Sequence, residues 1–136
     1  MSHKNLVSIF NEHLVEFFDD IQSIFPDNAD ILTGKNSLLM FKKINPALII
    51  RIWATYIASV YATQIENNDL TFFIGKDYST DLVYTSNAEK TMEIINRLRG
   101  PISQMNEAEQ TKTMKYIKNL SKLSMLHVQQ QQQQTK

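Results

Sequence analysis

Residues 6–26 read LVSIFNEHLVEFFDDIQSIFP, and this stretch decides the fold class of the chain. Apolar side chains recur in it at steps of three and four residues, with acidic and amide side chains between them. That spacing is the 3.6-residue period of an amphipathic helix, and it continues over about five turns. The helix is predicted to end at Phe25, because a residue that precedes a proline is disfavoured in the helical region.

The composition of the whole chain extends this helical reading. Among 136 residues there are 3 Gly and 3 Pro, which are too few for the many tight turns of a β-sandwich or barrel. The hydrophobic fraction is 43%, and a chain of this length buries enough surface to build one core. The sequence therefore predicts a single all-α domain over residues 1–126, a compact bundle of about five to seven helices.

The most apolar segment follows Asn45-Pro46 and is predicted to be the central helix of the bundle, from about residue 46 to 65. A proline at the first helical position loses only a donor that would have no partner, and the Asn45 side chain is expected to cap the first turn. A broad apolar face opposes a stripe of Ala54, Ala58 and Ala62. These small side chains would let a second helix approach closely.

Two short helices are predicted between the first helix and the central one. Asn28 supplies a capping oxygen for the first of them, which Gly34 is expected to end in the left-handed conformation. The second runs from about residue 36 to 44, with Leu38, Leu39, Phe41 and Ile44 as its apolar positions.

After the central helix the pattern predicts further helices and then a tail. Residues 69–74 favour a short helix over a strand, and residues 88–99 predict a helix that ends at Gly100-Pro101. Asn106 with Glu109 is a capping-box signature for the start of a last helix, from about residue 107 to 126. Residues 127–136 are rich in glutamine and are predicted to form a disordered tail.

The residue patterns that catalysis or metal binding requires are scarce. The chain has no cysteine, and none of its three histidines has a second histidine at the spacing of a helical metal site. There is no glycine-rich phosphate loop and no nucleophile elbow. An enzyme would have to use the carboxylates of residues 69–81, which local capping and pairing explain more simply. We therefore expect no catalytic residue, no metal site and no cofactor.

Formal charge is zero overall but unevenly distributed. Residues 1–87 hold 6 basic against 10 acidic side chains, and residues 88–136 hold 8 against 4. This polarity is compatible with head-to-tail packing, with an acidic partner for the second half, or with two halves that neutralise each other.

The candidate partner-binding residues are mostly basic. By 100° per residue, four lysines of the last predicted helix cluster within about a third of a turn, and two further candidates lie in the segment 76–81. These residues are Lys112, Lys115, Lys118, Lys122, Lys76 and Tyr78. The four lysines are typical of a solvated helix face, but they could also follow a phosphate backbone or bind an acidic protein. Zero net charge and scarce arginine count against nucleic acid.

Several motifs resemble a family of small uncharacterised proteins that large double-stranded DNA viruses of protists and algae encode. The likeness spans about residues 10 to 126 and lies outside the glutamine tail. The motifs are Phe25-Pro26-Asp27 followed by Asp30-Ile31-Leu32-Thr33, Asn45-Pro46 with Ile52-Trp53, DLTFFI at 69–74 with KDYS at 76–79, and MKYIKNL at 114–120. The resemblance carries over no catalytic or binding residue. It implies a viral protein in the cytoplasm of the infected cell or in the virion.

These patterns together favour a non-enzymatic helical interaction or structural protein that binds a protein partner or itself. The alternative is a nucleic-acid-associated protein that uses the basic face of its last helix. The longest apolar stretch, residues 48–62, contains Arg51 and is shorter than the roughly 20 residues of a membrane span, and no secretory signal is recognisable. We therefore expect no membrane insertion, no secretion and no small-molecule substrate.

Overall fold

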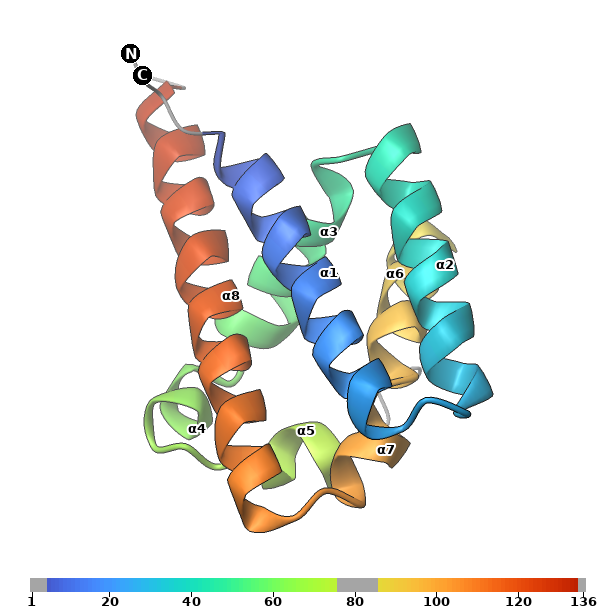
Figure 1. The fold of residues 1–136 in the computed structure, drawn as a ribbon. Helices are drawn as coiled ribbons and strands as arrows, with labels where there is room; N and C mark the ends of the chain where they lie inside the picture. The colour runs from blue at the N-terminus through green and yellow to red at the C-terminus, as the bar shows by residue number, and fades with distance from the viewer. Residues whose placement is uncertain (1–4, 76–85, 135–136) are drawn as a thin grey trace.

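Two long helices that lie far apart in the sequence pack side by side. The computed structural model describes residues 5–75 and 86–134, and in it α1 (Leu6–Ile24) and α8 (Glu107–Gln134) run in opposite directions (Figure 1). The side-chain oxygen of Asn5 accepts from the backbone N–H of Val7 at 3.0 Å, which begins α1 one turn before its first buried residue. The predicted helix and its end at Phe25 are confirmed.

The second helix, α2 (Ala29–Ile44), corrects the prediction of two short helices separated at Gly34. Asn28 caps α2 as predicted, because its side-chain oxygen accepts from the N–H of Ile31 at 3.1 Å. Gly34 lies within the helix and has no positive φ. A Cβ atom there would stand 2.9 Å from Cε2 of the buried Phe18 ring. Gly34 therefore allows α2 to pack closely against α1, and it does not terminate a helix.

The predicted central helix is broken into three pieces: α3 (Leu48–Trp53), the π-helical turn η1 (Ala54–Ala58) and α4 (Ala62–Glu66). The hydroxyls of Thr55 and Ser59 donate to backbone carbonyls four residues earlier, at 2.9 and 3.0 Å. Such side-chain bonds compete with the backbone hydrogen bonds of the helix and bend it, which accounts for the interruption before α4. Asn45 provides no side-chain cap to α3.

The predicted central position of this segment holds in spite of the break. The Trp53 side chain is fully buried, and its indole N–H donates to the Ser121 hydroxyl of α8 at 3.0 Å. Ala54 and Ala58 are buried as the alanine stripe predicts, whereas Ala62 is exposed in the separate helix α4.

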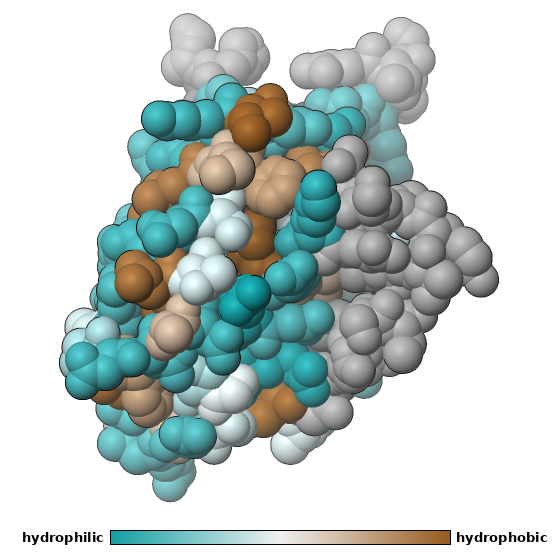
Figure 2. All heavy atoms as spheres, turned by 90° about the vertical axis from the view of Figure 1, so that its right-hand side faces the viewer, coloured by the Kyte–Doolittle hydropathy of each residue, from teal (hydrophilic) through white to brown (hydrophobic). Residues whose placement is uncertain are grey.

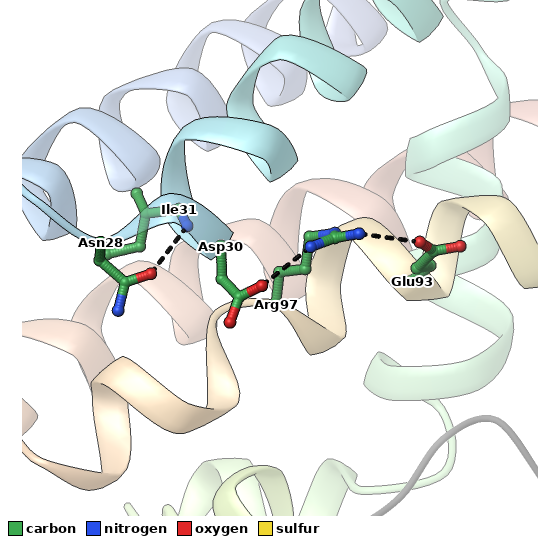
Figure 3. A network of polar contacts seen from close by, with 5 residues as sticks. All are labelled: Asn28, Asp30, Ile31, Glu93 and Arg97. Carbon is green, nitrogen blue, oxygen red and sulfur yellow. Dashed lines mark hydrogen bonds and ion pairs between the residues drawn. The ribbon is translucent and has the colours of Figure 1, made fainter.

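The helix α5 (Thr71–Gly75) confirms the short helix predicted over residues 69–74, and Asp69 accepts from the N–H of Thr71 at 3.0 Å. The next described helix, α6 (Ser86–Asn96), packs against α2. The guanidinium of Arg97 lies between the carboxylates of Asp30 and Glu93, at 2.9 and 3.1 Å, and so joins the two helices (Figure 3). Thr91, Ile94 and Ile95 of α6 and Leu98 just after it are all buried, which is consistent with the helix predicted over residues 88–99.

Gly100-Pro101, the predicted stop pair, lies inside the single-turn helix α7 (Arg99–Ser103). A proline in the first turn of a helix lacks an N–H that would have no partner there, so this pair is compatible with a new turn. The guanidinium of Arg99 donates to the carbonyls of Phe73 and Ile74, both at 3.1 Å. These bonds connect α7 to α5.

The last helix begins as predicted and ends later. Asn106 accepts from the N–H of Glu109 at 2.8 Å, and Glu109 accepts from the N–H of Asn106 at 3.0 Å, which is the complete capping box. In place of a disordered tail after residue 126, α8 continues to Gln134. His127 is buried and Val128 half-buried, and extending a helix that is already nucleated costs little for glutamine.

The prediction of a compact all-α bundle of about five to seven helices is confirmed. Its larger pieces are α1, α2, α3 with η1, α6 and α8, while α4, α5 and α7 are single turns. Residues 5–75 and 86–134 contain no β-strand, and no helix among them is long and apolar enough to cross a membrane. The core lies between these helices and contains Phe10, Leu14, Phe17, Phe18, Leu38, Ile50, Trp53, Ile95, Ile117 and Leu120 among others.

We predict that Gly34→Ala lowers the free energy of unfolding. Alanine is better than glycine in a helix by about 1 kcal/mol, but overpacking against the buried Phe18 ring costs about 1–3 kcal/mol. Urea unfolding followed by the fluorescence of Trp53 measures the difference.

The matched control for this prediction is Gly100→Ala. Nothing lies within 4 Å of a Cβ atom at that position, and the proline after it offsets the gain in helix propensity. Its free energy of unfolding should change by less than about 1 kcal/mol. A Gly34→Ala protein more stable than the parent would contradict the close packing of α2 on α1.

Candidate functional site

The predicted lysine cluster lies on the outer side of α8. Lys112, Lys115 and Lys122 are exposed, and Lys118 is half-buried. The two other predicted partner-binding residues, Lys76 and Tyr78, lie outside the described residues. The basic face of the last helix is therefore present, and what surrounds it decides what it can bind.

The structure divides these lysines between two sides of α8. Lys112 lies beside α1, where its Nζ is 3.3 Å from Oδ2 of Asp20. Lys122 lines a shallow hollow on the same side together with Glu12 and Glu16 of α1. Lys115 and Lys118 line a separate hollow on the side of Asn68 and Leu70. The acidic helix of the first half therefore flanks the basic helix of the second half, which favours mutual neutralisation among the three readings of the charge asymmetry.

A polar constellation lies in a hollow where α1 passes the start of α8. A hollow of about 240 Å³ has an apolar floor that includes Phe17, Ile21 and Met105. At the edge of this hollow, the Tyr116 phenol donates a hydrogen bond to the Asp20 carboxylate. The Tyr116 ring also stacks on the Phe17 ring, with centroids 4.9 Å apart. Sequence reasoning missed this contact, because it joins side chains 96 residues apart and depends on the pairing of the two helices.

The electrostatics of this hollow do not resemble those of an acid–base pair. The hydrogen bond from Tyr116 lowers the pKa of Asp20 below its usual range, and Lys112 lowers it further. Burial, followed by the neighbouring Asp20 carboxylate, raises the pKa of Tyr116. A general acid or base works best with a pKa near the operating pH, and both groups are displaced away from neutrality. The contact therefore joins α1 to α8 and is not poised for proton transfer.

Two acidic neighbours of α1 have separate partners. Asp19 forms an ion pair with Lys35 of α2, whereas Asp20 contacts α8. Each carboxylate contacts a different helix because adjacent helical residues point about 100° apart.

The buried histidine of α8 forms a second polar contact region. His127 lies beside Arg51 and Thr55, and its Nδ1 has no hydrogen-bond partner among the described residues. Burial lowers the pKa of His127, and the charge of Arg51 lowers it further. No group of three histidine, aspartate or glutamate side chains within residues 5–75 and 86–134 is arranged to hold a metal ion.

Sequence reasoning also missed an apolar surface on α2. Among the described residues, most of the large apolar side chains left exposed belong to this helix: Leu32 at 49%, Leu39 at 38%, Met40 at 61% and Ile44 at 72%. Figure 2 shows exposed apolar side chains among polar ones on the face of the molecule that carries α2. We call these four residues the α2 apolar face. A helical wheel over one continuous helix reveals it, and the predicted break at Gly34 concealed it.

Comparison of the chain with protein-family models, with curated proteins and with solved structures found no match. Each candidate site is therefore judged from its geometry and chemistry alone.

We predict that Tyr116→Phe raises the pKa of Asp20 towards its ordinary value of 3.8. The hydrogen bond from the phenol is the main cause of the lowered pKa, and the phenylalanine ring keeps the stacking on Phe17. Carbon-13 NMR of the Asp20 carboxyl group during an acid titration measures the shift. Lys112→Gln is the comparison and should raise the pKa less. A larger rise in Lys112→Gln than in Tyr116→Phe would contradict this ranking of causes.

We predict that His127 makes stability depend on pH. Its lowered pKa in the folded protein lies below the unfolded value of about 6.5. The contribution is therefore fully present above about pH 6.5 and is lost as the pH falls from there through the folded pKa. Urea unfolding at a series of pH values should show this loss in the parent and a smaller loss in His127→Gln. An identical pH dependence in both proteins would refute the role of His127.

Proposed function

We propose that the protein is a non-enzymatic helical interaction module, and that it binds a protein partner through the α2 apolar face. The observation that carries this proposal is the exposure of four large apolar side chains on one helix whose opposite side is buried in the core. Single exposed apolar residues are ordinary on protein surfaces, whereas several on one helix face favour an interaction site, here with the exposed polar residues Asn36 and Lys43 among them.

The arrangement along α2 supports a helical contact surface. Leu32, Leu39, Met40 and Ile44 are spaced by seven, one and four residues, which places them within about 140° of the helix circumference at 100° per residue. They follow the helix for about three turns. A partner helix or groove would cover all four side chains at once.

The polar hollow between α1 and α8 supports a role without catalysis. Its titratable groups, Asp20 and Tyr116, stabilise each other in their ordinary protonation states. The proposed module therefore uses this contact to fix its scaffold and uses α2 to bind.

The alternative candidate is nucleic-acid binding through Lys112, Lys115, Lys118 and Lys122. Four exposed or half-exposed cations on one helix support it, since a phosphate backbone attracts such a group. The acidic side of α1 counts against it, because Glu12, Glu16 and Asp20 would lie close to the same phosphates and repel them.

The viral context of the proposal rests on the motif resemblance over residues 10–126. That resemblance supports a role in the cytoplasm of an infected cell or in the virion. An all-α bundle with a helical contact surface is compatible with a structural or assembly role in either place.

Site-specific photo-crosslinking in expressing cells tests the proposed function against its alternative. A benzoylphenylalanine residue in place of Met40 samples the α2 apolar face, and the same residue in place of Lys115 samples the basic face of α8. We expect protein adducts from position 40 and only background from position 115. Nucleic-acid adducts from position 115, with no protein adduct from position 40, would overturn the proposal in favour of the alternative.

A further inference from the structure

We propose that the partner of the α2 apolar face is a second copy of this chain, with the two α2 helices packed antiparallel about a two-fold axis. This inference rests on the proposed function and names its partner. It comes from two properties of α2: Leu32 and Met40, two of its four exposed apolar residues, are placed symmetrically about the middle of the helix, and its two ends carry opposite charge.

One pair of these apolar residues is placed symmetrically about Asn36, an exposed residue near the middle of this 16-residue helix, whereas Leu39 and Ile44 mirror the polar residues Thr33 and Asn28. Leu32 and Met40 each lie four residues from Asn36, on opposite sides. In an antiparallel pair centred there, Leu32 of one copy faces Met40 of the other, and the same contact recurs on the far side of the axis. A closed two-fold interface requires this self-complementary arrangement of one surface patch.

The charges of α2 select the antiparallel orientation. Asp27 and Asp30 are exposed at its N-terminal end, and Lys43 is exposed near its C-terminal end. Antiparallel packing brings Lys43 of each copy to the acidic end of the other, whereas parallel packing would align like charges. The helix macrodipoles also favour the antiparallel pair.

The acidic end keeps excess negative charge in spite of its own ion pair. Arg97 lies between Asp30 and Glu93 (Figure 3). One guanidinium therefore pairs with two carboxylates, and Asp27 adds an exposed carboxylate just before the same helix as Asp30. The side chain of Asp30 is 63% exposed, so an incoming lysine can reach it.

Sedimentation equilibrium of the full chain over a wide concentration range tests the proposal. A contact made by one helix per copy is small, so we expect a reversible monomer–dimer equilibrium with a dissociation constant on the order of micromolar. Met40→Glu should raise that constant by about tenfold or more, because each dimer loses two apolar contacts and gains two buried charges. Circular dichroism of each variant establishes that the helical fold is retained.

Val60→Glu is the matched control. Val60 is 58% exposed in the turn between η1 and α4, so the substitution has the same chemistry away from the α2 apolar face. It should leave the dissociation constant unchanged. An equal loss of dimer in Val60→Glu and Met40→Glu would overturn the assignment to α2.

Charge exchange tests the orientation. Lys43→Glu and Asp27→Lys should each weaken the dimer by about twofold to tenfold, and the double variant should recover affinity because the unlike pair is restored with its signs reversed. Failure of the double variant to recover would overturn the antiparallel pairing.

The outcomes separate this inference from the proposed function. A protein that stays monomeric at all concentrations, yet forms adducts to another protein from position 40, refutes the second copy and leaves the interaction module intact. A monomeric protein without adducts refutes both.

Discussion

The buried indole of Trp53 is the contact on which the rest of the bundle depends. Its N–H donates to the Ser121 hydroxyl of α8, and its ring meets the edge of Phe10 of α1 at a centroid distance of 5.9 Å. A large aromatic side chain is stable in a core only when its polar group is paired, so Ser121 fixes where α8 crosses the central segment. The Asn11 amide donates to the Pro46 carbonyl at 2.9 Å and fixes where that segment begins.

The sequence was sufficient for the features that depend on neighbouring residues. The period of residues 6–24, the stop before Pro26 and the capping box of Asn106 and Glu109 all appear as predicted, because each arises within one or two helical turns. The features that depend on tertiary contacts were not predictable. Gly34 looked like a helix end until the Phe18 ring beside it was known, and the tail looked disordered until the burial of His127 was known.

The candidate sites show the same division between local and tertiary information. Helical spacing alone predicted the outward lysines of α8. The spacing did not show which groups neutralise these lysines. Asp20 comes close to Lys112 and Tyr116 only because helices from opposite ends of the chain pack together. The apolar face of α2 was hidden because the predicted helix end at Gly34 divided its residues between two short helices. These four residues are apolar enough to suggest that they lie in the core. The core is instead contacted by the opposite side of α2, which carries the buried residues Ile31, Gly34 and Leu38.

The glutamine tract prolongs α8 beyond its last buried side chain, His127, and Gln129 to Gln132 are exposed. A change in the number of glutamines here would alter the length of the exposed end of α8 without opening a void in the interior. Each added glutamine would advance the following residue by about 1.5 Å and turn it by about 100°. The packing of the core therefore does not constrain the length of this exposed part of α8.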